Sequence, residues 1–193
     1  MAELANLTVA VIATDGVEEK ELTGPVKTLR DAGAQVLILS PEGKRIQAFN
    51  HHDKGQQIDP DLDLAKAEPG SFDAVLLPGG ALNADFLRVM PKVQSFLRSL
   101  QEADKPFAVI CHAPWELISA GLVKGRKLTS YHTIQDDIRN AGGEWVDSEV
   151  VLDRNWVTSR QPSDIPAFNR EMLKLFSNSM RSMKTRERRE RVA

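Results

Sequence analysis

The sequence predicts an α/β protein, a three-layer α/β/α sandwich on a mostly parallel sheet. Short apolar runs rich in Val and Ile alternate with stretches of helix length, and polar turn residues come after the runs. Repeated strand, helix and strand segments are typical of right-handed crossover units, which build parallel sheets. The composition of the 193 residues does not shift abruptly, so we expect one domain over residues 1–179 and a basic tail over 180–193.

The first third of the chain predicts the start of this sheet. The apolar run at residues 7–13 leads into a polar turn and indicates a buried strand. We expect a helix over 19–32 and a second strand over 35–40. The stretch 42–63 is polar and turn-rich, which indicates a hairpin or excursion, followed by a helix near 62–67.

The rest of the chain continues the alternation. A third strand is expected over 72–77, ending in a glycine loop, and a helix over 84–103 comes next. The run 107–110 is the fourth strand, and a helix over 113–120 stops at Gly121. Further strands are expected at 127–131, 149–152 and 156–159, and further helices at 135–141 and 162–176.

Charge and hydropathy exclude several classes of protein. The net charge is −2, but residues 180–193 carry six basic residues against two glutamates, so the body is acidic. An acidic body predicts no specific binding to nucleic acid, and we expect the tail to be an extension or disordered. Apolar runs are too short to span a membrane and the amino terminus lacks a signal pattern, which predicts a cytoplasmic protein.

Cys111 is the strongest candidate for a reactive residue. It is the single cysteine, so it can form no internal disulfide and no multi-thiolate metal site. It lies between an apolar strand and a helix, where backbone N–H groups and the helix dipole favour a thiolate. His112 is the next residue and could act as general acid or base. The alternative is that Cys111 packs as a small buried hydrophobe.

Three loops are expected to meet at the carboxyl ends of the parallel strands, where such sheets bind ligands. They are residues 14–18, residues 78–85 and the pair at 111–112. Glu18, in the first loop, could hydrogen-bond to the sulfur or orient a substrate hydroxyl. We interpret His51, His52 and Asp53 as a surface loop rather than a metal site, and Tyr131 and His132 as packing at a strand end.

The residues around Cys111 resemble a known superfamily. The run AVICHAPWELISAGLVKGRKLTSY is similar to the nucleophile elbow of the ThiJ/PfpI superfamily and to the segment directly after that elbow. The segments TDGVEEKELTGP, FDAVLLPGG and DDIRNAGGEWVDSEVVLDRNWVTSR resemble its PfpI-type branch, so the resemblance covers nearly all of residues 7–177.

This resemblance implies a flavodoxin-like fold with an elbow and site residues for each role. It implies a nucleophilic Cys111, its partner His112 and Glu18 as the carboxylate beside the sulfur. It also implies a backbone loop at the site, formed here by Gly79, Gly80 and Ala113. Protease-like members complete a triad with an acid from a neighbouring subunit, for which the nearest candidate here is Asp85, a shorter and offset acid.

The family includes deglycases, glyoxalases, intracellular proteases and stress proteins, assembled as dimers or larger rings. We expect a stress-protective, cofactor-independent enzyme that acts on reactive dicarbonyls or their early adducts on proteins and nucleotides. The alternatives are a cysteine peptidase and a redox sensor that works through oxidation of Cys111. A glutamine amidotransferase ranks last, because the elbow lacks a glycine beside the cysteine pair and the later chain has no His-x-Glu pair.

Overall fold

The computed structural model describes residues 3–190, except for the side chains of Glu42 and of residues 183–190. Its centre is a seven-stranded sheet with the order β10-β11-β7-β6-β1-β2-β5. All neighbouring strands are parallel except β10, which runs antiparallel to β11 at one edge. The strands are β1 Thr8–Ile12, β2 Gln35–Ser40, β5 Leu62–Asp63, β6 Ala74–Leu77, β7 Phe107–Ile110, β10 Val150–Asp153 and β11 Trp156–Ser159.

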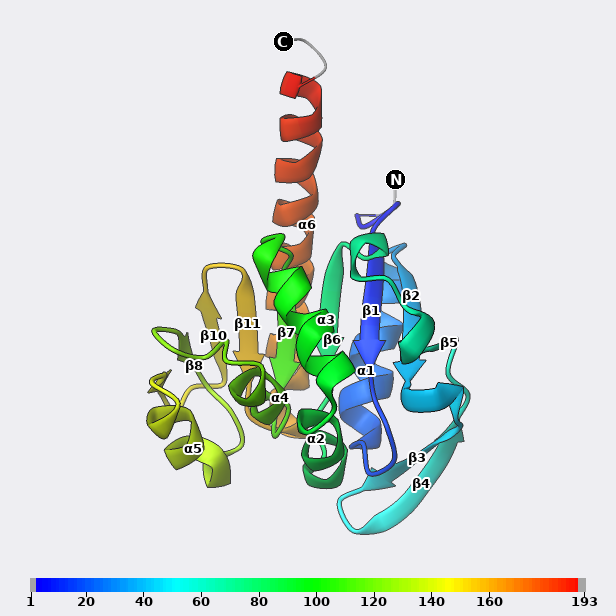
Figure 1. Ribbon diagram of the computed structural model, residues 1–193, viewed down its shortest axis with the longest axis vertical. Coiled ribbons are helices and arrows are strands. Elements are labelled where there is room, and N and C mark those ends of the chain that lie inside the picture. Colours follow the sequence, from blue (N-terminus) through cyan, green and yellow to red (C-terminus); the bar gives the residue numbers. More distant parts are fainter. Residues whose placement is uncertain (1–2, 191–193) are drawn as a thin grey trace.

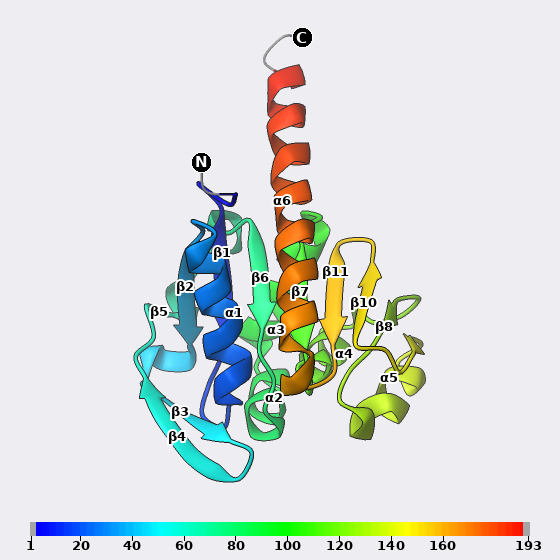
Figure 2. The ribbon, with the colours of Figure 1, turned by 180° about the vertical axis from the view of Figure 1, so that it is seen from behind.

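Helices cover both faces of the sheet and make three layers. Helices α1 (Glu19–Asp31) and α6 (Ile165–Glu190) lie on one face (Figure 2). On the other lie α2 (Ala81–Arg88), α3 (Pro91–Glu102) and α4 (Pro114–Ser119) (Figure 1). This arrangement confirms the predicted fold class.

The two cores result from the alternation of side chains along each strand. In β1, Val9 and Val11 pack with the α1 and α6 side, whereas Ala10 and Ile12 pack with the α3 and α4 side. All four side chains are fully buried, as expected for a strand with helices on both faces.

Smaller elements surround this sheet. A hairpin of β3 (Ile46–Asn50) and β4 (Asp53–Ile58) extends from the end of the sheet where the first strand leads into α1 (Figure 1). The other small elements are β8 Lys127–Leu128, β9 Glu144–Trp145, α5 Gln135–Asn140 and the 3-10 turns Pro41–Gly43, Leu64–Lys66, Pro69–Ser71, His132–Ile134 and Pro162–Asp164.

Three expected helices differ in the structure. The helix expected near 62–67 is instead β5 followed by a 3-10 turn. The helix expected over 84–103 is two helices, because Pro91 lacks the N–H that would continue α2. The last helix begins at Ile165 and continues to Glu190 rather than ending near Phe176, so the basic tail is helical as far as it is described.

Candidate active site

The strand β7 ends in a sharp bend at Cys111. The φ angle of Cys111 is +66°, a left-handed backbone conformation that residues other than glycine rarely adopt. Two backbone hydrogen bonds hold it: the Cys111 N–H donates to the Ser159 carbonyl (3.0 Å), and the Tyr131 N–H donates to the Cys111 carbonyl (2.9 Å). The predicted elbow is therefore present, with its strain supported by neighbouring strand ends.

The bend places the sulfur at the wall of a cavity of about 690 Å³. Cys111 is 6% exposed and its Sγ lies 3.2 Å from Nδ1 of His112. The backbone N–H groups of Gly80 and His112 face the sulfur and lower its pKa. The expected convergence of three loops is seen in the cavity lining: Gly16, Glu18, Glu21, Phe49, His51, His52, Gly80, Ala81, Leu82, Cys111, His112, Tyr131, Gln161, Pro162 and Ser163.

The carboxyl group against the sulfur is that of Glu21, not that of Glu18 as the sequence analysis expected. Glu21 hydrogen-bonds to the Cys111 thiol, and its Oε2 also accepts a hydrogen bond from the Gly79 N–H (3.0 Å). Glu18 instead accepts a hydrogen bond from the His51 N–H through Oε2 (3.0 Å). The two glutamates share the cavity, but only Glu21 hydrogen-bonds to the sulfur.

A signal for Glu21 was present in the sequence. Glu21, Pro25 and Leu29 are spaced by four residues and form one buried stripe of α1. A carboxylate within an apolar stripe is a candidate functional group, because burial of its charge is unfavourable. Glu18 lies just before the helix, and its position in a strand-end loop drew the assignment there.

Burial raises the pKa of Glu21 to about 8, and the negative charge of Glu18 is the second cause. Burial also raises the pKa of the Cys111 thiol well above its usual range, and the charge of Glu21 adds to this effect. The prediction that Cys111 is a thiolate at neutral pH is therefore wrong, because burial raises the pKa of the thiol more than the backbone N–H groups lower it. Above about pH 8 Glu21 and Cys111 together have lost one proton, so the pair carries one negative charge.

His112 is placed to move protons to and from the sulfur. Its Nδ1 faces Sγ, its Nε2 lies 3.4 Å from Oγ1 of Thr133, and its ring packs between those of Trp115 and Tyr131. Burial, with His132 nearby, lowers the pKa of His112. A neutral imidazole at neutral pH can act as a general base.

The third member of a triad is not seen among the residues that the structure describes. No carboxylate of the described residues hydrogen-bonds to His112. Asp85 is exposed on α2 and does not line the cavity. Its expected contribution to a neighbouring subunit stays a prediction.

The glycine loop has a geometric requirement at both glycines. A Cβ on Gly79 would collide with Glu21 Oε2 and with Cys111 Cβ. Gly80 has a φ of +95°, and a Cβ there would collide with the carbonyl oxygen of Gly16. The close approach lets the Gly80 N–H reach the sulfur.

Only part of the expected backbone loop can hold an oxyanion. The Gly79 N–H is taken by Glu21, and the Ala113 N–H donates to the Ile110 carbonyl (3.2 Å). Ala113 is fully buried in the core on the α3 and α4 side and does not line the cavity. The donors that face the sulfur are therefore the N–H groups of Gly80 and His112.

The hairpin β3–β4 brings two histidines, His51 and His52, to the cavity. The sequence alone had indicated a surface loop at these residues. The loop before α1 pairs with β3, with the Phe49 N–H donating to the Val17 carbonyl (2.8 Å). This pairing places His51 and His52 in the cavity lining, although the His51 side chain is 76% exposed. Among the described residues no group of three His, Cys, Asp or Glu has the geometry to hold a metal ion.

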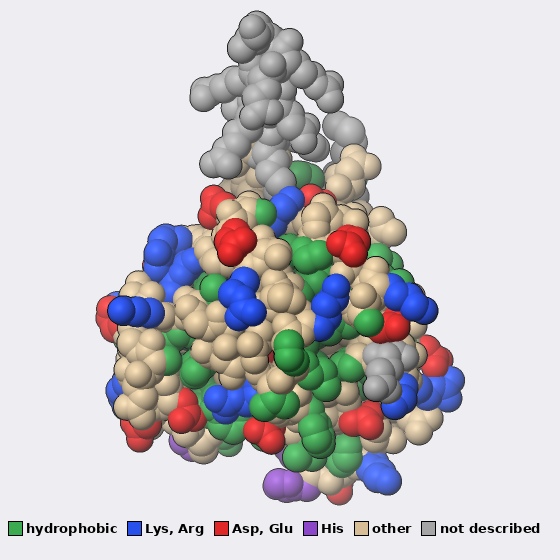
Figure 3. Space-filling view, viewed as in Figure 1, with side chains coloured by type: hydrophobic (Ala, Val, Ile, Leu, Met, Phe, Trp, Pro, Cys, Tyr) green, Lys and Arg blue, Asp and Glu red, His purple; other side chains and the backbone are tan. Residues whose placement is uncertain are grey.

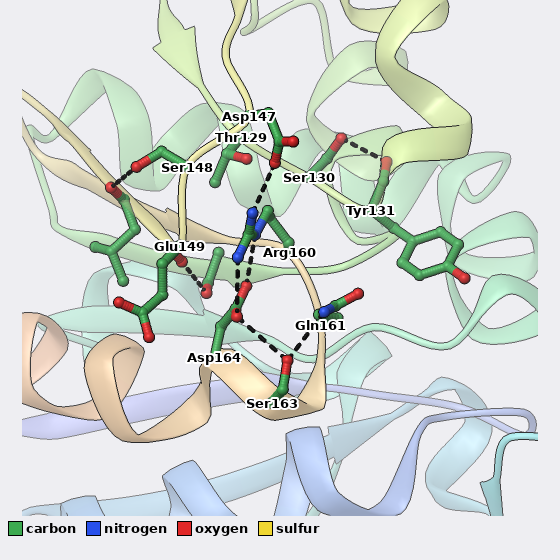
Figure 4. A network of polar contacts seen from close by, with 12 residues as sticks. Thr129, Ser130, Tyr131, Asp147, Ser148, Glu149, Arg160, Gln161, Ser163 and Asp164 are labelled. Carbon is green, nitrogen blue, oxygen red and sulfur yellow. Dashed lines mark hydrogen bonds and ion pairs between the residues drawn. The ribbon is translucent and has the colours of Figure 1, made fainter.

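An ion-pair network supports the part of the cavity wall that residues 161–163 form (Figure 4). Arg160, directly after β11, pairs with Asp147 (2.7 Å) and with both carboxylate oxygens of Asp164 (2.8 and 3.2 Å). Ser163 bridges Asp164 and Gln161, so the turn that lines the cavity is held to the end of β11. The neighbouring residue in β11, Ser159, holds the elbow.

These features define the class of the protein as α/β with a cysteine at a nucleophile elbow. The sheet is flavodoxin-like, the cysteine has a positive φ at the strand-to-helix bend, and a histidine follows it directly. The family model described as the DJ-1/PfpI family matches residues 7–175. The chain belongs to this family.

Relatives with curated descriptions cover most of the chain. It is 41% identical to "Deglycase TK1284" of Thermococcus kodakarensis over 86% of this chain and 98% of that protein. It is 41% identical to "Protein/nucleic acid deglycase 2" of Escherichia coli, over 86% and 96%. It is 39% identical to "Putative cysteine protease YraA" of Bacillus subtilis, over 86% and 96%.

A solved structure has the same fold. Drosophila melanogaster DJ-1beta superposes with a TM-score of 0.80 at 29% identity, covering 92% of this chain and 97% of that one. No helix within residues 3–190 is long and apolar enough to span a membrane.

Proposed function

We propose that this protein is a cysteine-dependent, stress-protective enzyme that acts on reactive dicarbonyls and on their early adducts with proteins and nucleotides. The observation that carries the proposal is the set of groups around one sulfur. Cys111 faces the cavity with a carboxyl, an imidazole and two backbone N–H donors against it. Relatives that are described as deglycases support the same chemistry.

The reaction can be derived from these groups. The Cys111 sulfur adds to the aldehyde carbon of methylglyoxal as the thiol proton passes to His112, whose Nδ1 lies 3.2 Å from Sγ. The product is a hemithioacetal whose oxyanion is held by the Gly80 and His112 N–H groups. His112 moves a proton from that carbon to the neighbouring carbonyl carbon through an enediol, which yields a thioester of lactate. Water then hydrolyses the thioester and releases lactate and the free thiol.

An early adduct undergoes the same reactions after one additional step, in which the sulfur displaces the amine. Its aminocarbinol carbon releases the amine, which takes up a proton, and the sulfur takes the place of the amine on that carbon. The sum is adduct plus water giving amine and lactate, and no external oxidant or cofactor is consumed.

The test is the Cys111-dependent formation of lactate. We expect the purified protein to convert methylglyoxal and its adducts to lactate above the rate of a Cys111→Ala variant, with buffer-catalysed decay of the adducts subtracted. Lactate formation equal in both proteins would exclude the proposal.

The two alternatives are supported less well. The description of the relative YraA supports a peptidase, but His112 has no orienting carboxylate among the described residues. A redox sensor is supported by Glu21, whose proton at neutral pH could be donated to an oxidised sulfur. Resistance of Cys111 to mild peroxide, measured by mass spectrometry, would exclude the sensor.

We also propose that the protein is cytoplasmic and forms a homodimer or higher homo-oligomer. Three large apolar side chains at α2 are exposed: Leu82 (56%), Phe86 (52%) and Val89 (69%). Apolar side chains gather over this part of the surface (Figure 3). A patch of this kind beside a cavity supports contact with a second copy.

A further inference from the structure

The cavity around Cys111 has an uneven set of charges. Among the described residues, its lining contains two carboxyl groups and three imidazoles but no lysine or arginine; these groups belong to Glu18, Glu21, His51, His52 and His112. Arg160 lies behind one wall, where Asp147 and Asp164 neutralise it. With Glu21 protonated at neutral pH, Glu18 is left as the carboxylate whose negative charge reaches the cavity.

Glu18 is held firmly with one oxygen available. The residue is 7% exposed, its N–H donates to the Gly79 carbonyl (3.3 Å), and it forms a bridge to Phe49 of β3. Its Oε2 accepts the His51 N–H and lies 4.0 Å from Nδ1 of the same histidine, whereas no hydrogen bond to Oε1 is found within residues 3–190. A nearly buried carboxylate with a free acceptor on a ligand cavity favours a ligand that carries positive charge.

The same charge acts on the nucleophile. The negative charge of Glu18 raises the pKa of Glu21, which shares its proton with Cys111. A cation beside Glu18 would offset this charge and make loss of the shared proton easier, because opposite charges in a cavity interact strongly. A phosphate would have the opposite effect on both binding and ionisation.

We propose that Glu18 determines substrate class. It selects dicarbonyl adducts on cationic groups, such as the guanidinium and amine groups of arginine and lysine side chains, over adducts on phosphate-bearing nucleotides. This inference rests on the proposed function. Glu18 is then a specificity residue that contacts the carrier of the adduct, while Glu21 and His112 serve the sulfur.

The first test measures the electrostatic basis without turnover. Cys111 is the only cysteine, so methanethiosulfonate reagents report on one site: the thiolate attacks the sulfenyl sulfur, a mixed disulfide forms and methanesulfinate leaves. We expect the trimethylammonium-ethyl reagent to react about tenfold faster than the sulfonato-ethyl reagent, after division by their ratio on a free thiol.

Variants assign this preference to Glu18. Glu18→Gln should lower the ratio at least about fivefold, and Glu18→Asp, which keeps the charge, should retain most of it. Glu102→Gln removes the same formal charge at the far end of α3 and should leave the ratio unchanged. A ratio near one in the wild type, or a ratio unchanged in Glu18→Gln, would overturn the proposal.

The second test compares methylglyoxal adducts of acetylarginine amide, guanosine and guanosine monophosphate, each corrected with Cys111→Ala. We expect kcat/KM to fall in that order, and Glu18→Gln to narrow the gap between guanosine and its monophosphate about fivefold. Equal rates on the two guanosine adducts would refute the inference alone. Absence of Cys111-dependent turnover on all three adducts would refute the proposed function and the inference with it.

Discussion

The protonated carboxyl of Glu21 should make the stability of this protein depend on pH in a definite direction. The folded state raises the pKa of Glu21 from 4.5 to about 8, so between these values the folded protein binds a proton that the unfolded chain has lost. Stability from this group is fully present below pH 4.5 and is lost as the pH rises through about 8. The slope approaches about 1.4 kcal/mol per pH unit in that window, about 5 kcal/mol in all.

The variant Glu21→Gln removes this dependence, because an amide is neutral at every pH and has nearly the same shape. The free energy of unfolding of the variant, relative to wild type, should therefore rise with pH from 4.5 to 8. Over the part of the window between pH 5 and 7 the expected gain is about 3 kcal/mol.

Urea denaturation at half-unit pH steps measures this difference, and other titrating groups cancel between the two proteins. Glu102→Gln serves as the matched control, because its exposed carboxylate on α3 should give a flat difference. A flat difference for Glu21→Gln, or a difference that falls with pH, would refute the assignment of a buried, protonated Glu21.

Three other perturbations have definite expected outcomes. Alkylation of Cys111 by iodoacetamide should accelerate about tenfold per pH unit below about pH 8 and then level off, because the Glu21–Cys111 pair loses its first proton near that pH. Mass spectrometry measures the rate, and a rate independent of pH between 6 and 8 would contradict the shared proton. Glu116 is fully buried, and neither of its carboxyl oxygens has a hydrogen-bond partner among the described residues. Glu116→Met should therefore raise the free energy of unfolding by about 1–3 kcal/mol in urea at pH 7, and a lower value would contradict an unpartnered carboxyl. Phe86→Glu, on the exposed face of α2, should shift an oligomer towards monomer in sedimentation velocity. Lys92→Glu, on neighbouring α3, is the control and should leave the oligomer unchanged. An oligomer that persists in Phe86→Glu would exclude this patch as the interface.

The assignments in the loop before α1 show where reasoning from sequence ends. Both Glu18 and Glu21 were visible as carboxylates after the first strand, and Glu18 was placed beside the sulfur. The structure separates them by one turn of helix: the Glu21 side chain points inward beneath Gly79, and Glu18 turns to the His51 N–H of the hairpin. Which glutamate reaches the sulfur depends on how α1 is rotated against β7, and residues 21 and 111 meet only through the tertiary fold.

The sequence by itself determined the layered α/β sheet, the positions of its main strands and the elbow at Cys111, because apolar runs, turn residues and the proline that opens α4 are local signals. Tertiary structure alone decided that burial outweighs the N–H donors at the sulfur, that Glu21 shares its proton, and that the hairpin carries His51 and His52 to the cavity. The physical reason is that desolvation and charge coupling depend on which distant segments enclose a group, and local sequence patterns do not encode that enclosure.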